Sequence, residues 1–230
     1  MIKGLIFDLD GTLIDSIGDI AFSANLTLKE NGYKERSEDF VRMATGRGFK
    51  KLIADMLPEG SSDELVDEIT KKFAVNYGNH YCERTKAYDG IYDLLRALQD
   101  KGIKLAVNSN KKDEMTKNLM KKIFPEINFL EVIGERVGIA NKPDPYTALE
   151  IVSKMGFNIN EVMYVGDSEV DINTANNAKL KSIGCLWGFR DRETLNKQGA
   201  TYIVEKPSDI LEIVKWMQLF KNLSSCRLFL

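Results

Sequence analysis

Phe7-Asp8-Leu9-Asp10-Gly11-Thr12-Leu13 is the stretch that decides the fold of this chain. The apolar residues that lead into it predict a buried strand, and two acids one residue apart end that strand. Unpaired charge at such a place is strongly disfavoured unless it binds a metal, a substrate or both. In an open α/β sheet, the carboxyl end of the first strand lies at the topological switch point, where ligands bind. We therefore expect a ligand site at Asp8 and Asp10.

Strand-like and helix-like segments alternate over most of the chain. Apolar, β-branched runs predict strands near residues 3–8, 104–108, 131–134, 162–166, 182–186 and 202–204. Helical patterns follow them at residues 90–101, 111–124, 145–155, 170–179, 192–199 and 208–221. Alternating βα units imply a parallel sheet with right-handed crossovers, so the predicted fold class is α/β with a Rossmann-like core.

The alternation stops between about residues 15 and 84, where no strand-like run occurs. Helical patterns there cover residues 17–31, 37–45, 48–56 and 63–81, with Ser37 and Ser62 placed as N-caps. An insertion directly after the first strand predicts a small helical cap domain over the switch point. We place the cap at residues 15–84, the core at 1–14 and 85–222, and hinges near 14–18 and 83–88. The tail 222–230 has no assigned role.

Three further polar segments are Asn108-Ser109-Asn110-Lys111, Lys142-Pro143 and Gly166-Asp167-Ser168-x-x-Asp171, of which the first and the third end predicted strands. Ser109 could donate to an anion or could cap the next helix, and Lys111 is as easily a solvated helix-start residue as an active-site cation. The four-residue spacing of Asp167 and Asp171 puts both on one face of a helix start. Carboxylates without His or Cys suit Mg²⁺, although Asp171 could also simply complement the helix dipole.

In this order, the four segments resemble the motifs of the haloacid dehalogenase superfamily of phosphatases and phosphomutases. The resemblance spans roughly residues 2–205. Within the superfamily, Trp187-Gly188-Phe189-Arg190 and the short helical insertion are most similar to the phosphoglycolate phosphatase-like branch. The resemblance implies a parallel α/β core with an inserted cap and an enzyme that transfers phosphoryl groups.

The resemblance also implies roles for the acids. Asp8 would be the nucleophile and Asp10 the general acid and base, although both could instead cap the turn that follows. An acid at position 10 favours phosphate substrates, because the superfamily's dehalogenases lack one there. The Asp8 carboxylate, the Asp10 carbonyl and Asp167 would bind Mg²⁺, with Asp171 as an indirect or water-mediated partner.

Other polar residues are expected to contact the substrate. Ser109 and Lys142 would act with the two acids of the first motif in catalysis, Ser109 on a phosphoryl oxygen and Lys142 against developing charge. Thr12 and Asn110 are expected to be substrate contacts, Asn110 the weaker inference. Arg47, between two glycines, would bind the substrate's remote anion in a fork, unless it is an exposed loop arginine.

Composition argues against several classes of protein. A net charge of −2 gives no basic footprint for nucleic acid. No run approaches the ~18 apolar residues of a membrane span, and no signal peptide fits before Asp8. Cys82, Cys185 and Cys226 are widely spaced, as in reduced cytoplasmic proteins, and His80 is the only histidine. We expect a cytoplasmic protein without a membrane or nucleic-acid partner.

The sequence thus predicts a Mg²⁺-dependent phosphatase for a small phosphorylated metabolite, acting through an aspartyl phosphate as a monomer or homodimer. The resemblance implies that this metabolite is phosphoglycolate-like. The alternatives are a mutase like β-phosphoglucomutase, a pyrophosphatase and a generalist sugar or nucleotide phosphatase. The mutase would use the same motifs and return the phosphoryl group to a sugar instead of to water. A non-catalytic interaction protein on the same fold is a further alternative, and it would tolerate loss of Asp8, Asp10, Lys142 or Asp167.

Overall fold

A computed structural model describes residues 1–226, with side chains described through Met217. Within that range, parallel strands form a six-stranded sheet in the order β5-β4-β1-β6-β7-β8. The strands are β1 (Gly4–Phe7), β4 (Lys104–Lys112), β5 (Phe129–Glu135), β6 (Val162–Gly166), β7 (Lys181–Cys185) and β8 (Tyr202–Val204). The carboxyl end of β1 therefore lies between β4 and β6, at the switch point that the sequence indicated.

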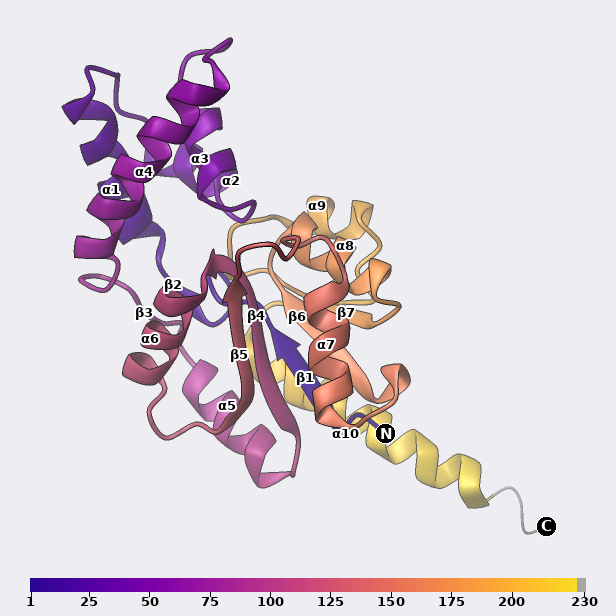
Figure 1. The fold of residues 1–230 in the computed structure, drawn as a ribbon. Helices are drawn as coiled ribbons and strands as arrows, with labels where there is room; N and C mark the ends of the chain where they lie inside the picture. Colours follow the sequence, from indigo (N-terminus) through magenta and orange to yellow (C-terminus); the bar gives the residue numbers. More distant parts are fainter. Residues whose placement is uncertain (227–230) are drawn as a thin grey trace.

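Helices cover both faces of the sheet (Figure 1). Leu5 and Phe7 pack on one face against α5 (Ile91–Asp100), α6 (Asp113–Ile123) and α10 (Pro207–Cys226). Ile6 packs on the other face against α7 (Tyr146–Met155) and α8 (Glu169–Asn177). The short η1 (Ile159–Glu161) and α9 (Arg192–Lys197) complete this part. Successive side chains of β1 therefore enter the two apolar clusters in turn. Asp8, the next residue, lies just beyond the carboxyl end of the strand.

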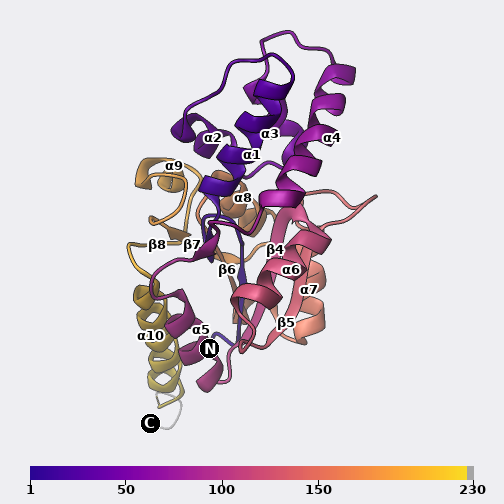
Figure 2. The ribbon, with the colours of Figure 1, turned by 90° about the vertical axis from the view of Figure 1, so that its left-hand side faces the viewer.

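A separate group of helices stands over the carboxyl edge of the sheet in both ribbon views (Figures 1 and 2). These helices, called the cap below, have their own apolar cluster: α1 (Ile17–Glu30), α2 (Glu38–Ala44), α3 (Phe49–Met56) and α4 (Asp63–His80). The predicted N-caps are confirmed, because Ser37 accepts from the amide of Phe40 and Ser62 from that of Leu65. The predicted α/β fold with an inserted helical cap is therefore confirmed.

The two linkers between core and cap run side by side. They pair as the antiparallel strands β2 (Ile14–Asp15) and β3 (Lys86–Ala87). Buried Asp19, in the first turn of α1, accepts hydrogen bonds from the backbone amides of Glu83, Arg84 and Thr85. These hydrogen bonds hold together the two chain segments that lead into and out of the cap. The predicted limits at residues 15 and 84 fall within these linkers and stay a prediction.

The main difference from the predicted elements is in β4. The strand was expected to end at Asn108, but it continues to Lys112 after a shift in its register with β5. The side chains of Asn110 and Lys111 bond to buried partners from this extended backbone, which accounts for the longer strand. Consequently α6 begins at Asp113, and its N-cap is Lys112. Ser109 is thus not the cap of that helix.

The C-terminal helix is longer than expected. α10 runs to Cys226 rather than ending near residue 221, and residues 227–230 of the tail lie outside the described part of the chain. Across the described residues, the structure has no helix of the length and apolarity that crossing a bilayer demands.

Candidate active site

The four motifs meet at the carboxyl edge of the sheet. Asp8 directly follows β1, Ser109 lies in the end of β4, and Asp167 directly follows β6. Lys142 comes from the loop before α7 and is buried beside them. Residues that are far apart in sequence are thereby brought to one place, because the carboxyl ends of neighbouring parallel strands share one edge of the sheet.

Asp8 is buried, with 6% of its surface exposed. Its Oδ1 accepts from the Leu9 amide at 2.6 Å and pairs with the Lys142 Nζ at 2.8 Å. The closest contacts of the Asp8 carboxylate are thus both made by Oδ1. Burial and repulsion from Asp171 raise the pKa of Asp8 well above its usual range, although Lys142 opposes the shift. The Oδ2 atom is therefore the one that can meet a ligand.

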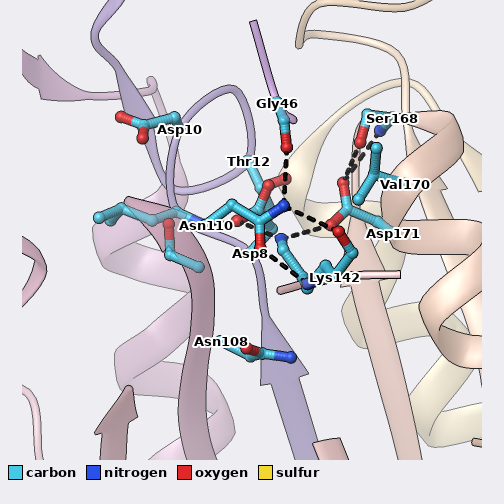
Figure 3. Close-up of polar contacts among 12 residues, drawn as sticks. Asp8, Asp10, Thr12, Gly46, Asn108, Asn110, Lys142, Ser168, Val170 and Asp171 are labelled. Atoms are coloured by element: carbon cyan, nitrogen blue, oxygen red, sulfur yellow. Dashed lines mark hydrogen bonds and ion pairs between the residues drawn. The ribbon is translucent and has the colours of Figure 1, made fainter. Parts of the chain in front are cut away.

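Lys142 lies between Asp8 and Asp171 (Figure 3). Its Nζ is 2.7 Å from Asp171 Oδ1, while Asp171 Oδ2 accepts from the amide and the hydroxyl of Ser168. Asp171 therefore has two roles: it accepts hydrogen bonds at the start of α8, and it pairs with Lys142. Burial disfavours the ammonium, but the two carboxylates outweigh burial and raise the pKa of Lys142, which keeps it charged.

Asp167 is held by two donors. The Thr12 hydroxyl donates to its Oδ1 at 2.9 Å, and the Phe189 amide donates to its Oδ2 at 2.7 Å. Burial, with repulsion from Asp171, raises the pKa of Asp167 to about 7. Thr12 was expected to bind substrate; in the structure its hydroxyl orients this carboxylate, and a substrate contact stays a prediction.

The acids at this edge fit a divalent cation. One carboxylate oxygen from each of Asp8, Asp167 and Asp171 lies within 4.8 Å of the others, and all three residues are buried. Three buried carboxylates repel one another, as the raised pKa values of Asp8 and Asp167 reflect, and a cation would relieve that repulsion. Oxygen donors without nitrogen or sulfur suit Mg²⁺. Both oxygens of Asp171 and both oxygens of Asp167 have partners, but Asp171 is paired with the Lys142 ammonium, whereas the donors to Asp167 are neutral. Asp8 and Asp167 stay the predicted direct ligands, with Asp171 as an indirect partner.

Asp10 points away from Lys142 (Figure 3). Its Oδ1 accepts from the Ser16 hydroxyl at 2.6 Å and lies 2.9 Å from the Lys111 Nζ. Lys111 also donates to the hydroxyl of Tyr77, which belongs to α4 of the cap. The two acids of the first motif therefore have different cations, and the one beside Asp10 is shared with the cap.

Ser109 and Asn110 have different surroundings. The Ser109 Oγ accepts from the Lys111 amide at 3.2 Å, which leaves its own proton to donate. The Asn110 amide group bonds to both backbone groups of Lys142 and to the carbonyl of Gly46 in the cap. Asn110 thus positions Lys142 and touches the cap, and its direct contact with substrate stays a prediction.

A small cavity of about 40 Å³ separates core and cap. We call its core side the floor, which consists of Asp8, Asp10, Ser109, Asn110, Lys111 and Lys142. We call its cap side the roof, which consists of Ile20, Thr45, Gly46, Gly48, Phe49 and Leu52. The floor carries the charges, and the roof is mostly apolar. The cavity has the character of a site for a small ligand whose charged group meets the floor.

Arg47 does not line this cavity. Its guanidinium pairs with Asp55 of α3 at 2.8 Å, and its side chain is 38% exposed. An exposed loop arginine was the alternative that the sequence left open, and the structure adds its pairing with Asp55. The contact with a remote anion therefore stays a prediction for Arg47, without support from its position in this structure.

Phe189 and Arg190 join core and cap, a role that the sequence did not predict for them. Arg190 is buried, pairs with Glu169 at 2.7 Å and donates to the carbonyls of Arg42, Met43 and Thr45, at the end of α2. The Phe189 side chain packs into the apolar cluster of the cap. The carbonyls that Arg190 binds near the end of α2 lie 145 to 148 positions away in the sequence, and no local pattern predicts these contacts.

Comparison with known proteins agrees with this geometry. The chain is 34% identical over 214 residues to a phosphoglycolate phosphatase of Aquifex aeolicus, covering 91% of this chain and 95% of the relative. It is 30% identical to the phosphoglycolate phosphatase of Mannheimia succiniciproducens, covering 90% and 96%. A crystal structure of a predicted phosphoglycolate phosphatase from Haemophilus somnus has a TM-score of 0.84 at 27% identity, covering 93% and 98%.

The family comparison covers most of both the core and the cap. The model of the haloacid dehalogenase-like hydrolases matches residues 5–185, which include all four motifs. The resemblance inferred from the motifs, including its phosphoglycolate phosphatase-like branch, is thereby confirmed. This chain belongs to the haloacid dehalogenase-like hydrolase family.

Proposed function

We propose that this protein is a Mg²⁺-dependent phosphatase that hydrolyses phosphoglycolate, or a phosphomonoester close to it, through an aspartyl phosphate on Asp8. The observation that carries the proposal is the carboxylate of Asp8, which lies at the cavity floor and makes its closest contacts, to Leu9 and Lys142, through Oδ1. The family and the named relatives bear out the expected enzyme class, a phosphoric monoester hydrolase.

In the first step, Asp8 Oδ2 would attack phosphorus while the bond to the leaving oxygen breaks. Lys142 holds positive charge beside the attacking carboxylate, and the Ser109 hydroxyl is placed to donate to a phosphoryl oxygen. Asp10 would give its proton to the leaving oxygen, which departs as an alcohol. Mg²⁺, held by Asp8 and Asp167, would supply further positive charge to the phosphoryl oxygens.

In the second step, the Asp10 carboxylate would take a proton from water. The water oxygen attacks phosphorus, the bond to Asp8 Oδ2 breaks, and inorganic phosphate leaves. Both acids are then in their starting forms. The floor supplies a separate cation for each acid, so one carboxylate can attack while the other exchanges a proton.

The cavity supports a small substrate with a charged remote end. The cavity is small and is enclosed between the charged floor and the mostly apolar roof, which supports a small phosphomonoester. In the roof, Gly48 is the N-cap of α3 and provides no side-chain cap, so backbone amides of the first turn stay available to an anion. Such amides, rather than Arg47, would receive the carboxylate of phosphoglycolate.

The cap would close over the bound substrate and exclude bulk water from the first step. Movement would occur at the paired linkers β2 and β3, with residues 15–84 moving as one unit. We place the protein in the cytoplasm, where Cys82 and Cys185, which form no disulfide in the structure, would stay reduced. It would work as a monomer or homodimer.

A substrate panel tests the proposal. Phosphate release would be measured with Mg²⁺, and with a chelator as control, for phosphoglycolate, pyrophosphate, hexose phosphates and nucleotides. We expect kcat/KM to be largest for phosphoglycolate and release to stop without Mg²⁺. Conversion of a hexose 1-phosphate to its 6-phosphate, with little phosphate released from any compound, would instead identify a mutase.

A further inference from the structure

Lys111 is a buried cation that connects the core to the cap. Its Nζ is 2.9 Å from Oδ1 of Asp10 in the core and 2.5 Å from the hydroxyl of Tyr77 in α4 of the cap. The Lys111 side chain is 1% exposed, and its ammonium also lies 4.6 Å from the centre of the Tyr77 ring. Burial of an ammonium is unfavourable unless it is paired, and Asp10 and Tyr77 are the partners that the structure provides.

The Tyr77 hydroxyl is held in place by the interior of the cap. The Tyr77 ring stacks on Phe73 at 5.5 Å and meets Phe49 edge-on at 5.5 Å, and Tyr77 is fully buried. Phe49 is itself part of the roof. The position of this hydroxyl relative to Lys111 is therefore fixed by how the cap sits on the core. Movement of the cap away from the core would take the Tyr77 hydroxyl from Lys111.

The closest contacts of the Asp10 carboxylate are made by one oxygen. The Ser16 hydroxyl, at 2.6 Å, and the Lys111 ammonium, at 2.9 Å, both engage Oδ1. Ser16 is the N-cap residue of α1, directly after the linker strand β2. Both partners that fix the Asp10 carboxylate are thus tied to the cap, Ser16 through the chain and Lys111 through Tyr77.

We propose that Lys111 is a positioning residue that makes the acid and base work of Asp10 depend on closure of the cap. In the closed arrangement, Tyr77 holds the ammonium where it binds Oδ1, which leaves Oδ2 of Asp10 for the leaving oxygen and later for water. In an open arrangement, Lys111 loses one partner and Asp10 loses its fixed orientation. This inference rests on the proposed function, in which Asp10 exchanges the proton.

The burial of Lys111 supports this role rather than that of a solvated helix-start residue. Burial disfavours its charged form, but Asp10 and Tyr77 outweigh burial and raise the pKa of Lys111 above its usual range. The ammonium therefore stays charged in the closed arrangement and can orient a carboxylate. Asp8 has no such connection, because its cation Lys142 is paired within the core.

The test compares Lys111→Met, Tyr77→Phe and the double variant, with Tyr81→Phe as the matched control. Tyr81 is one helical turn further along, and its ring contacts Tyr77, but its hydroxyl bonds to neither Lys111 nor Asp10. kcat and KM would be measured for an alkyl phosphate and for p-nitrophenyl phosphate, whose leaving group needs little protonation. Thermal unfolding would show that each variant is folded.

We expect Lys111→Met to lower kcat for the alkyl phosphate by about 10²-fold, with a smaller loss for p-nitrophenyl phosphate, because general acid catalysis is impaired. Tyr77→Phe should lower it by roughly tenfold in the same pattern, and Tyr81→Phe should leave it unchanged. The double variant should be no slower than Lys111→Met alone, because Tyr77 acts through Lys111.

Three results would overturn the inference. They are an unchanged kcat in folded Lys111→Met, a rise in KM without the leaving-group pattern, and losses that multiply in the double variant. Asp10→Asn separates this inference from the proposed function. If Asp10→Asn is impaired while Lys111→Met is normal, only the inference fails; if Asp10→Asn is fully active, the proposed acid and base role fails as well.

Discussion

The floor of the cavity carries charged side chains, whereas the roof is mostly apolar. The floor places Asp8, Asp10 and two lysines at the ends of parallel strands, where each charge has an opposite partner within 3 Å. The roof presents Ile20, Phe49 and Leu52 from helices of the cap. Charges in fixed positions suit bond making and breaking, whereas an apolar surface suits exclusion of water and selection by size. The difference indicates that the core supplies the chemistry and the cap supplies the substrate range.

The largest effect is expected from the floor. Asp8→Asn should lower kcat by more than about 10³-fold, because the amide cannot form the phosphorylated intermediate. The melting temperature of the metal-free protein should stay the same or rise, since the pKa of Asp8 shows that its ionised form is unfavourable in the fold. A variant with wild-type kcat would remove Asp8 as the nucleophile.

Asp10→Asn should separate proton transfer from nucleophilic attack within the floor. We expect turnover of an alkyl phosphate to fall by about 10²- to 10⁴-fold, and that of p-nitrophenyl phosphate to fall less, because its leaving group departs without a proton. Steady-state kinetics over leaving groups of graded pKa would show the trend. Equal losses for every leaving group would mean that Asp10 is not the acid.

Substitutions in the roof should change KM more than kcat. Phe49→Ala opens the roof and should raise KM for phosphoglycolate several-fold, at a stability cost of about 1–3 kcal/mol. Arg47→Ala, which breaks an exposed ion pair with Asp55, should change stability by less than about 0.5 kcal/mol and KM by little. A rise in KM for Arg47→Ala that is larger for anionic substrates than for p-nitrophenyl phosphate would instead show that Arg47 reaches the substrate.

The smallest effect concerns pH and the metal. The pKa of Asp167 is raised to about 7, so the fold is favoured at low pH by the protonated carboxyl, and this contribution is lost as pH rises through 7. The melting temperature of the metal-free protein should therefore contain a component that falls between about pH 4, near the pKa of an unfolded Asp, and about pH 7, and that levels off above this range. Mg²⁺ should offset the loss, because it binds the ionised form.

Asp167→Asn is the control for this component. It removes the titrating group, so its melting temperature should vary less over the same pH range, and Mg²⁺ should stabilise it less than the wild type. An identical pH profile for variant and wild type, with identical stabilisation by Mg²⁺, would show that Asp167 neither titrates in this range nor binds the metal.

The sequence predicted the floor better than the roof. The sequence predicted one common site for Asp8, Lys142 and Asp167. This was possible because the carboxyl ends of parallel strands meet at one edge of the sheet. The start of the cap and the positions of its helices were predicted from the absence of strand-like runs and from the helix N-cap residues Ser37 and Ser62. These features depend on local pattern and on one topological rule.

Contacts between cap and core could not be predicted in this way. Tyr77 meets Lys111 across 34 positions, and Arg190 meets the end of α2 across about 145, with no spacing rule to connect them. The extension of β4 through Lys111 was missed for the same reason, since its cause is tertiary bonding rather than propensity. The ion pair that holds Arg47 on Asp55 is equally invisible to a motif.

The central claim is that Asp8 carries the phosphoryl group during turnover. Rapid acid quench of the enzyme in the presence of phosphoglycolate and Mg²⁺, followed by peptide mass analysis, measures this directly. The account predicts one added phosphoryl group on the peptide that contains Asp8, formed fast enough to account for kcat and absent from Asp8→Asn. Steady release of phosphate with no phosphoryl group on Asp8, or with the group on another residue, would contradict it.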